Sequence, residues 1–233
     1  MAEIAAKLFA PRNSVIEGHV GTYKMLFDFR DSIQRQAYFG IYEQPETRLL
    51  SRLLSAGDIF LDIGANVGYF SLVASQIVGA GGQVHSFEPI AENAAILWRT
   101  VADNQISNIV VNQVAVGAHL GSLDLFVPDG DIGNTGWASV VPSQRRPNTV
   151  TVEQIAIDGY LRSEGICGTR LVKLDIEGHE LEALKGMNAL LERPDAPDLL
   201  CEVNSWLLEK LELDPGLLPR YLTGHGYLLY RIG

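Results

Sequence analysis

The sequence contains few cysteines and comparatively few basic residues, and each shortage narrows what the protein can be. Only Cys167 and Cys201 occur in its 233 residues, each beside an apolar stretch. Two such thiols do not form the disulfide framework of a small secreted protein, so we expect both to be reduced and to lie in or near the core. The 18 basic residues face 28 acidic ones, a formal net charge of −10. Binding to bulk nucleic acid needs clustered positive charge, and we therefore do not expect it.

The chain also lacks a long uninterrupted apolar run. Its longest apolar region, 59–78, is interrupted by Asp62, Asn66 and glycines, so a membrane-spanning helix there would be costly. Residues 2–11 lack the apolar stretch of a signal peptide. Hydrophobic residues make up 47% of the chain, which is enough for a sizeable core. We expect a cytoplasmic protein without a transmembrane segment.

From about residue 56 onward, apolar strands alternate with amphipathic helices. The expected elements are strands over 58–63, 83–87, 109–114, 171–175 and 199–203 and helices over 69–77, 91–102, 179–191 and 215–223. In the helix over 91–102 we expect Trp98 on the common apolar face, and Asp158 is expected to cap a further short helix. Alternation of this kind predicts a parallel sheet covered by helices.

An N-terminal accessory segment, residues 1–55, is expected to pack on this core. It contains a hairpin strand over 22–29 and a helix over 46–54, whose start suits Pro45. The remaining residues, 56–233, are expected to form one domain. The predicted fold class is thus α/β, with a mostly parallel and doubly wound sheet.

The alternation stops within an insertion at about 118–156. Strands over 122–127 and 148–153 are expected to pair antiparallel around a long stretch rich in Gly, Pro and Asn. A loop of this length inside a compact domain is more often a lid or binding loop than a plain connection. The insertion is therefore predicted to be an antiparallel hairpin with a lid.

The most informative turn follows the first core strand and reads Asp62-Ile-Gly-Ala-Asn-Val-Gly68. Glycines here let the backbone turn sharply and let a ligand approach the peptide groups, at a position that is a ligand crevice in open α/β sheets. A dinucleotide would favour glycine where Asn66 stands, and the Asp62 carboxylate would oppose a pyrophosphate. The same carboxylate would attract the amino group and sulfonium of S-adenosylmethionine. The turn therefore favours a cationic ligand over a diphosphate.

A second acidic position, Glu88, follows the second core strand. A carboxylate there can accept hydrogen bonds from both hydroxyls of a ribose. Its spacing from the glycine turn is what separates it from an ordinary surface residue. The two features together indicate a nucleoside-binding crevice.

A third constellation, Lys173-Leu-Asp-Ile-Glu-Gly-His-Glu180, follows a later strand. Parallel strands gather their carboxyl ends at one edge, so we expect Asp175 to face the same crevice as the first two motifs. Lys173 shares a strand face with Asp175 and can pair with it or with a substrate. Glu177 and Glu180 have an alternative role, which is to complement the dipole of the following helix.

Together these motifs resemble the FkbM-type methyltransferases. The resemblance rests on Asp62–Tyr69, Phe87–Pro89, Val114–Gly117, Ile157–Asp158, Lys173–Glu180 and Glu202–Val203. The element over 173–180, joined to the glycine turn at this distance, is its specific part. The glycine turn alone would indicate only the class I methyltransferase superfamily.

The resemblance implies a Rossmann-like class I methyltransferase domain with S-adenosylmethionine as donor. It also implies a hydroxyl acceptor on a sugar, glycan, glycolipid or polyketide-type product. The positions assigned to the cofactor are Asp62, Gly64, Asn66, Gly68, Tyr69, Glu88, Pro89 and Val116. Because the chain ends soon after 227–232, a seventh strand common in the superfamily is either displaced into the accessory segment or absent.

Methyl transfer to an alcohol needs alignment of the reacting atoms and a base for the hydroxyl proton. Asp175 and His179 are the candidate bases, and Lys173 is expected to orient the carboxylate or the acceptor. As an alternative, Asp175 and Glu177 hold Mg²⁺, which lowers the pKa of the hydroxyl, although no paired metal-ligand spacing makes a metal the default.

The acceptor is expected to meet a lid over 129–139. Asn134, Trp137 and Ser139 are its candidate contact residues, and Trp137 either stacks on a sugar ring or pins the loop to the core. Tyr38, Tyr42 and Glu43 are expected to line the same crevice, because their segment leads into the core. The sequence does not identify the small-molecule or glycan acceptor or the oligomeric state, for which a dimer is one open alternative.

Three rival functions remain at this point. An NAD-dependent oxidoreductase would share the fold, but Asn66 and Asp62 oppose it. A non-catalytic adenosylmethionine-binding protein would retain Asp62 and Glu88 without requiring Asp175. Methylation of nucleic-acid amino groups is disfavoured because the Asn/Asp-Pro-Pro-aromatic motif is missing.

Overall fold

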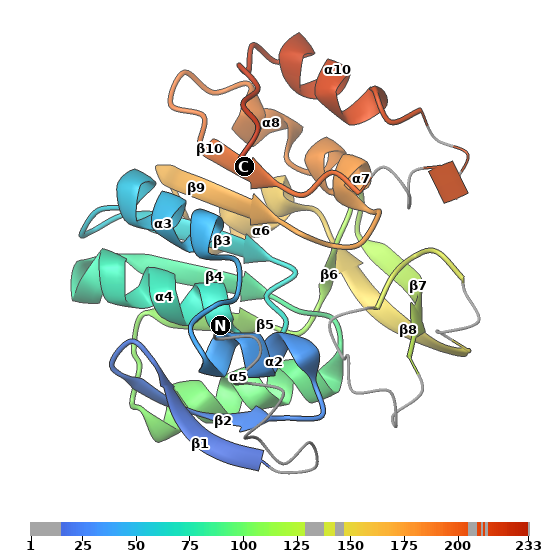
Figure 1. Ribbon diagram of the computed structural model, residues 1–233. Helices are drawn as coiled ribbons and strands as arrows, with labels where there is room; N and C mark the ends of the chain where they lie inside the picture. Colours follow the sequence, from blue (N-terminus) through green and yellow to red (C-terminus); the bar gives the residue numbers. More distant parts are fainter. Residues whose placement is uncertain are drawn as a thin grey trace.

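The computed structural model describes residues 15–128, 138–142, 147–204, 209–210, 212 and 214–232. At its centre, a five-stranded parallel sheet runs in the order β10-β9-β3-β4-β5 (Figure 1). Its strands are β3 (Ile59–Ile63), β4 (Gln83–Phe87), β5 (Ile109–Asn112), β9 (Thr169–Leu174) and β10 (Asp198–Cys201). The strand order reverses between β3 and β9, which is where open α/β sheets bind ligands. The predicted α/β class with a mostly parallel sheet is confirmed.

Helices cover both faces of this sheet (Figure 1). They are α3 (Gln44–Leu53), α4 (Tyr69–Val78) and α5 (Ala91–Asp103) on one face, and α6 (Ile157–Glu164), α7 (Glu180–Lys185), α8 (Asn188–Leu191) and α10 (Leu217–Gly224) on the other. Two clusters of buried apolar residues follow this division, one under each layer of helices. The sheet is therefore doubly wound, with a core on either side.

Successive side chains along a strand point to opposite faces of the sheet, so the position of each site residue in its strand decides which face it lies on. Phe60 belongs to the cluster under α4, whereas Leu61 belongs to the opposite cluster. Asp62, two residues after Phe60, therefore faces the α4 side. In β9 the same parity carries Leu171 and Lys173 to that side, and Lys173 is the register partner of Asp62. Two charged residues thus meet at the centre of the sheet.

An N-terminal hairpin and a short helix precede the core. The hairpin, β1 (Val15–Val20) and β2 (Tyr23–Asp28), forms its own two-stranded antiparallel sheet. Phe27 and Phe29 are fully buried in the cluster that also contains Phe60. The hairpin is therefore joined to the core by apolar packing.

Helix α2 (Ser32–Tyr38) was not predicted from the sequence. It begins after Asp31, whose carboxylate accepts the amides of Ile33 at 2.7 Å and Gln34 at 3.0 Å. An aspartate followed by a helical turn is an N-cap signal. The helix is short, and its apolar pattern does not separate it from the preceding strand.

The insertion forms a second sheet beside the first (Figure 1). Strands β6 (Ala115–Val116), β7 (Gly121–Val127) and β8 (Asn148–Ile155) are ordered β6-β8-β7, with β7 and β8 antiparallel as predicted. Asn134 and Trp137 of the predicted lid lie outside the described residues.

The single helix predicted over 179–191 is wrong, because two helices, α7 and α8, occupy this stretch. They are separated at Gly186, where a Cβ atom would collide with the carbonyl oxygen of Gly117. The chain turns where another backbone segment approaches it closely. Apolar spacing continues through this turn and therefore concealed it.

Asp158 caps a different helix from the one expected. It is the second residue of α6, and its carboxylate accepts the amides of Ala189 at 2.8 Å and Leu190 at 3.0 Å. These amides belong to the first turn of α8, whose N-terminal groups have no partners within the helix. Asp158 thus holds two helices together on one face of the sheet.

Two side chains are more exposed than expected. Trp98 is 43% exposed, because α5 turns Ala94, Leu97 and Thr100 inward instead. Cys167 is exposed, whereas Cys201 is partly buried, and both are free thiols.

None of the helices in the described part of the chain is long and apolar enough to cross a membrane. Residues 227–232 form no strand, and the N-terminal hairpin is a separate sheet, so the central sheet shows no seventh strand among the described residues.

Replacing Asp158 by alanine is expected to lower the free energy of unfolding by about 1 kcal/mol, because two amides of α8 lose their acceptor. Urea unfolding followed by circular dichroism measures this loss. Glu164→Ala, at an exposed position of α6, is the control and should stay within about 0.5 kcal/mol of the wild type. Equal losses in both variants would contradict the capping role.

Candidate active site

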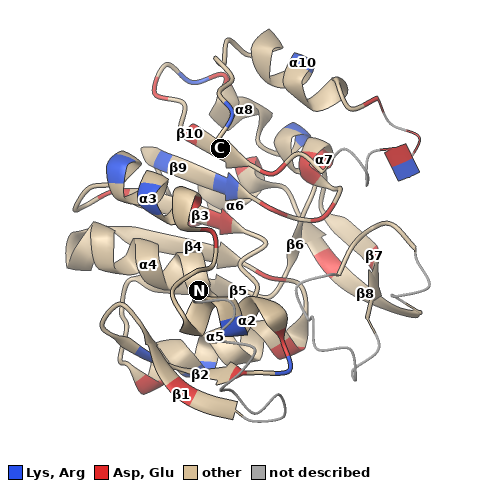
Figure 2. Cartoon of the chain, in the orientation of Figure 1, with Lys and Arg blue, Asp and Glu red and all other residues tan. Residues whose placement is uncertain are grey.

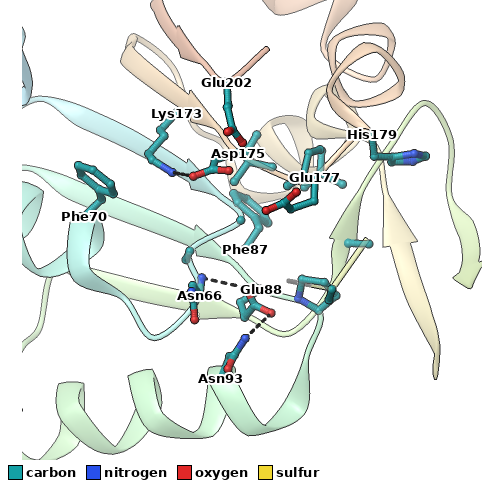
Figure 3. Close-up of a pocket in the computed structure, with 18 of the residues that line it drawn as sticks. Asn66, Phe70, Phe87, Glu88, Asn93, Lys173, Asp175, Glu177, His179 and Glu202 are labelled. Atoms are coloured by element: carbon teal, nitrogen blue, oxygen red, sulfur yellow. Dashed lines mark hydrogen bonds and ion pairs between the residues drawn. The ribbon is translucent and has the colours of Figure 1, made fainter. Parts of the chain in front are cut away.

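A cavity of about 260 Å³ opens at the carboxyl ends of β3, β4 and β9 (Figure 3). Its walls are the turn after β3, the residues after β4, the loop after β9, and Tyr42 and Glu43 from the segment before α3. Small-molecule pockets typically measure about 300–1,000 Å³, so the volume is close to that of a modest ligand. All three motifs found in the sequence contribute to this one cavity.

Backbone contacts fix the turn between β3 and α4. The amides of Gly64 and Ala65 both donate to the Phe87 carbonyl oxygen, at 2.9 and 3.0 Å. Gly64 has a φ of 85°, and a Cβ atom there would collide with the carbonyl oxygen of Asp175. Asn66 has a φ of 51°, a conformation that asparagine tolerates better than most residues. The turn therefore joins the ends of β3, β4 and β9.

Glu88, directly after β4, is 5% exposed and accepts three hydrogen bonds. Its Oε2 accepts the Asn66 amide at 2.8 Å, and its Oε1 accepts the Ile90 amide at 2.9 Å and the Asn93 side-chain amide at 3.4 Å (Figure 3). Burial raises the pKa of Glu88 to about 7, although these hydrogen bonds act in the opposite direction. Its charge therefore changes near neutral pH.

Lys173 is buried at the back of the cavity, with its Nζ 2.8 Å from Asp175 Oδ2 and 4.8 Å from the centre of the Phe70 ring. Burial by itself lowers the pKa of Lys173, but the negative charges around it, that of Asp175 first, outweigh burial and leave the pKa raised. The ammonium group therefore stays charged.

Asp62 lies behind the glycine turn and does not line the cavity. It is fully buried, and its Oδ2 accepts the Ser71 hydroxyl at 2.5 Å. Ser71 also contacts the hydroxyl of Ser86, the register partner of Asp62 in β4, at 2.7 Å. The Oδ1 atom of Asp62 has no hydrogen-bond partner in the described part of the chain, and burial raises the pKa of Asp62. The predicted contact between Asp62 and a cationic cofactor stays a prediction.

A second carboxyl group, that of Glu202, meets Asp175 in the cavity. Figure 3 shows the two groups turned toward one another, close enough for each to shift the pKa of the other. Burial by itself would raise the pKa of Asp175, but the charge of Lys173 and the neighbouring Glu202 carboxyl group hold it below its usual range. Glu202 stays exposed at the edge of the cavity, and its partial desolvation together with the Asp175 charge raises the pKa of Glu202 to about 9.

The loop after β9 is fixed by its own side chains and by the insertion. Glu180 is 2% exposed, and its Oε1 accepts the amides of Ile176 at 3.1 Å and Gly178 at 3.2 Å. The Ser139 hydroxyl donates to the Glu177 carbonyl oxygen at 2.6 Å. Glu180 and Ser139 therefore shape the cavity from behind.

His179 also lines the cavity, but its ring extends away from Asp175 in Figure 3. Its Nε2 contacts Gln154 Oε1 on β8 at 3.1 Å, and burial lowers its pKa. Of the two candidate bases, Asp175 is thus the one at the centre of the charged group.

Most of the residues predicted from the sequence line the cavity. The cofactor positions that do so are Gly64, Asn66, Tyr69, Glu88, Pro89 and Val116. The predicted catalytic and acceptor residues that do so are Tyr42, Lys173, Asp175, Glu177 and His179. Gly68, with a φ of 94°, instead packs against Leu97 beneath the turn, and Ser139 is fully buried beside the lining residue Ala138.

Glu43 lines the cavity as expected, whereas Tyr38 does not and packs edge-on against Phe27 and Phe29 instead. Sequence reasoning gave no site role to several lining residues, which are Phe70, Phe87, Asn93 and Glu202. Glu202 had a usable signal, since an acid that ends a strand next to β9 must reach the same edge. Asn93 and Phe70 lie within helices and carry no such signal.

Metal and polyanion binding have no direct support in the described residues. They contain no group of three His, Cys, Asp or Glu side chains arranged to hold a metal ion. Figure 2 shows the described Lys and Arg residues on several elements, including α2, α3 and β9. The magnesium alternative and the expected lack of a nucleic-acid partner both stay predictions.

Comparison with known proteins identifies relatives of the chain. The family model described as the methyltransferase FkbM domain matches residues 62–229. The hexuronic acid methyltransferase AglP of Haloferax volcanii is 28% identical over 150 residues, which cover 64% of this chain and 58% of AglP. The 31-O-demethyl-FK506 methyltransferase FkbM of Streptomyces tacrolimicus is 23% identical over 257 residues, covering 97% of this chain and 90% of that protein.

Among solved structures, the precorrin-6y C5,15-methyltransferase of Geobacter metallireducens aligns with a TM-score of 0.44 and 14% identity, over 78% of this chain and 69% of that one. The family match begins at the glycine turn and continues past every strand end that forms the cavity. The protein therefore belongs to the FkbM family of methyltransferases.

Proposed function

We propose that the protein transfers a methyl group from S-adenosylmethionine to a hydroxyl group of a sugar, a glycan or a glycosylated or polyketide-type small molecule. The observation that carries this proposal is the single cavity that joins Glu88 beside the glycine turn to Asp175 at the end of β9. The names of two relatives, a hexuronic acid methyltransferase and a 31-O-demethyl-FK506 methyltransferase, support a hydroxylated acceptor.

The chemistry of the cavity near β4 fits the nucleoside part of the cofactor. Glu88 is held by backbone amides, and an ionised carboxylate has about four acceptor positions, so ligand hydroxyls can join or replace the long Asn93 contact. Phe87, Pro89 and Val116 add apolar surface beside it. Gly64 lets the turn after β3 pack directly against the Asp175 carbonyl oxygen, with which a Cβ atom would collide.

The cavity near β9 fits an acceptor hydroxyl. Bound S-adenosylmethionine supplies an electrophilic methyl group on a sulfonium, a good leaving group. The residues then have two tasks, which are to align the acceptor oxygen and to take its proton. Asp175 faces the cavity and is oriented by Lys173, so it is the proposed base.

Tyr42 and Glu43 extend the acceptor wall from the N-terminal segment. Tyr42 packs edge-on against Tyr69, with ring centroids 5.3 Å apart, and both line the cavity. The Tyr42 hydroxyl and the Glu43 carboxyl group lie close enough for each to shift the pKa of the other. A hydroxyl and a carboxyl group at this wall suit recognition of a polyhydroxylated acceptor.

Binding of S-adenosylmethionine is expected to be about tenfold weaker at pH 6 than at pH 8. Glu88 accepts ribose hydroxyls best when it is ionised. Because its pKa is about 7, lowering the pH from 8 to 6 protonates Glu88 in the free protein and so weakens binding. Glu88→Gln should bind at least about tenfold more weakly at pH 8 and should lose this pH dependence. Isothermal titration calorimetry across this pH range measures both effects.

The matched control is Glu92→Gln, at an exposed position of α5. It should retain the wild-type affinity and pH dependence. NAD titrated in parallel should not bind. Unchanged binding by Glu88→Gln, or a preference for NAD, would contradict the assignment of S-adenosylmethionine to this part of the cavity.

Asp175→Asn is expected to lower the rate of methyl transfer by about 10²- to 10⁴-fold, the usual contribution of a positioned base, with little change in cofactor affinity. Release of S-adenosylhomocysteine from a panel of methyl glycosides, methyl glucuronides and hydroxylated macrolactones measures the rate. His179→Gln, the matched control in the same loop, should stay within a few-fold of wild type because the ring contacts Gln154 instead. The reverse ranking of the two variants would assign the base to His179.

A further inference from the structure

Glu202 reaches Asp175 because of the register between β10 and β9. Cys201 pairs with Leu174, and the amide of Glu202 donates to the Leu174 carbonyl oxygen at 2.9 Å, so the pairing continues one residue beyond the strands. Equivalent positions on adjacent parallel strands project from the same face of the sheet. Glu202 and Asp175 therefore stand side by side at the cavity wall (Figure 3).

Two carboxyl groups in contact do not both remain ionised. Their mutual repulsion favours a state in which one proton lies between them, as in other carboxyl pairs that share a site. Lys173 Nζ, 2.8 Å from Asp175 Oδ2, keeps the negative charge on Asp175. The proton accordingly belongs to Glu202 at neutral pH, which agrees with its pKa of about 9.

Among the described residues, charged and titratable groups face this pair from several neighbouring segments. They are Lys173 on β9, Asp62 on β3, Glu177 and Glu180 in the loop after β9, Cys201 on β10, and Tyr42 and Glu43 before α3. The pKa values of Lys173, Tyr42 and Cys201 are all raised, so their titration is moved away from the range between pH 7 and 9. Most of the remaining groups are acids, which disfavour a second negative charge on the pair.

We propose that Glu202 is a second catalytic carboxyl group, and that the Asp175–Glu202 pair acts as the base for the acceptor hydroxyl once it has released its shared proton. This inference rests on the proposed function and adds a residue and a protonation requirement to it. With the shared proton in place, Asp175 is hydrogen-bonded and paired with Lys173, so it is a weak base. Without that proton, the pair carries two negative charges and is a stronger base.

Methyl transfer starts from the deprotonated pair. The acceptor O–H bond breaks and its proton moves to a carboxylate oxygen of the pair. A lone pair of the acceptor oxygen forms the new bond to the methyl carbon, and the electrons of the carbon–sulfur bond remain on sulfur. The products are the methyl ether, S-adenosylhomocysteine and a pair that again holds one proton.

The proton itself is tested without any acceptor. Infrared difference spectra of the wild-type protein between pH 7.5 and pH 10 should show the loss of one protonated carboxyl band, and Glu202→Gln should lack that loss. Glu88, whose pKa is raised to about 7, titrates mostly below this range and is present in both proteins. An unchanged difference spectrum in Glu202→Gln would overturn the shared proton.

The catalytic role is tested with the acceptor that the panel identifies, at saturating S-adenosylmethionine. The wild-type kcat/KM should rise about tenfold per pH unit between pH 7 and 8.5 and level off near pH 9 to 10. Glu202→Gln should lose this rise and remain low at every pH, whereas Glu202→Asp should keep it at a reduced rate. A purely structural role would lower the rate without changing the shape of the profile, and that result would overturn the proposal.

The outcomes also separate this inference from the proposed function. A wild-type protein that binds S-adenosylmethionine but methylates none of the panel would contradict the proposed function and the catalytic role together. The infrared result alone would then decide whether Asp175 and Glu202 share a proton. A wild-type protein that methylates an acceptor with a flat pH profile would retain the proposed function and reject Glu202 as part of the base.

Discussion

The ammonium group of Lys173 lies inside the protein beside the Phe70 ring, where an unpaired charge would cost several kcal/mol. Asp175 neutralises it from the end of the same strand, and Asp62 stands opposite it in the register of β3. Removing either carboxylate would change the charge balance around a buried ammonium group. This pairing therefore connects the ends of β3 and β9 beside Phe70 of α4.

The cavity follows from the same arrangement. Because Gly64 passes close to the Asp175 carbonyl oxygen, the turn after β3 and the loop after β9 are in direct contact, and Glu88 completes the wall from β4. In the proposed function, the part beside Glu88 holds the nucleoside and the part beside Asp175 holds the hydroxylated acceptor. A methyl group between them would lie near the ends of β3 and β9, and its alignment with the acceptor oxygen and the sulfur atom would govern the rate.

The sequence predicted the strand ends well, because apolar strands, glycine turns and acids after strands are local signals. It did not predict how deeply each side chain is buried, because burial depends on the neighbouring segments. Asp62 is covered by Ser71, and Trp98 points outward because α5 packs another of its faces against the core. The partners of Asp158 and Glu202 were also hidden, since one contact joins two helices and the other depends on the register between β10 and β9. Contacts of this kind are set by packing rather than by spacing along the chain.

The crystal structure of the protein with S-adenosylhomocysteine tests the central claim most directly, namely that one cavity holds the cofactor against Glu88 and directs the reacting centre toward Asp175. The account predicts ribose hydroxyls within hydrogen-bond distance of the Glu88 carboxylate and a sulfur atom on the side of the cavity lined by Asp175 and Glu202. A nucleoside bound away from Glu88, or a sulfur atom directed away from the carboxyl pair, would contradict it.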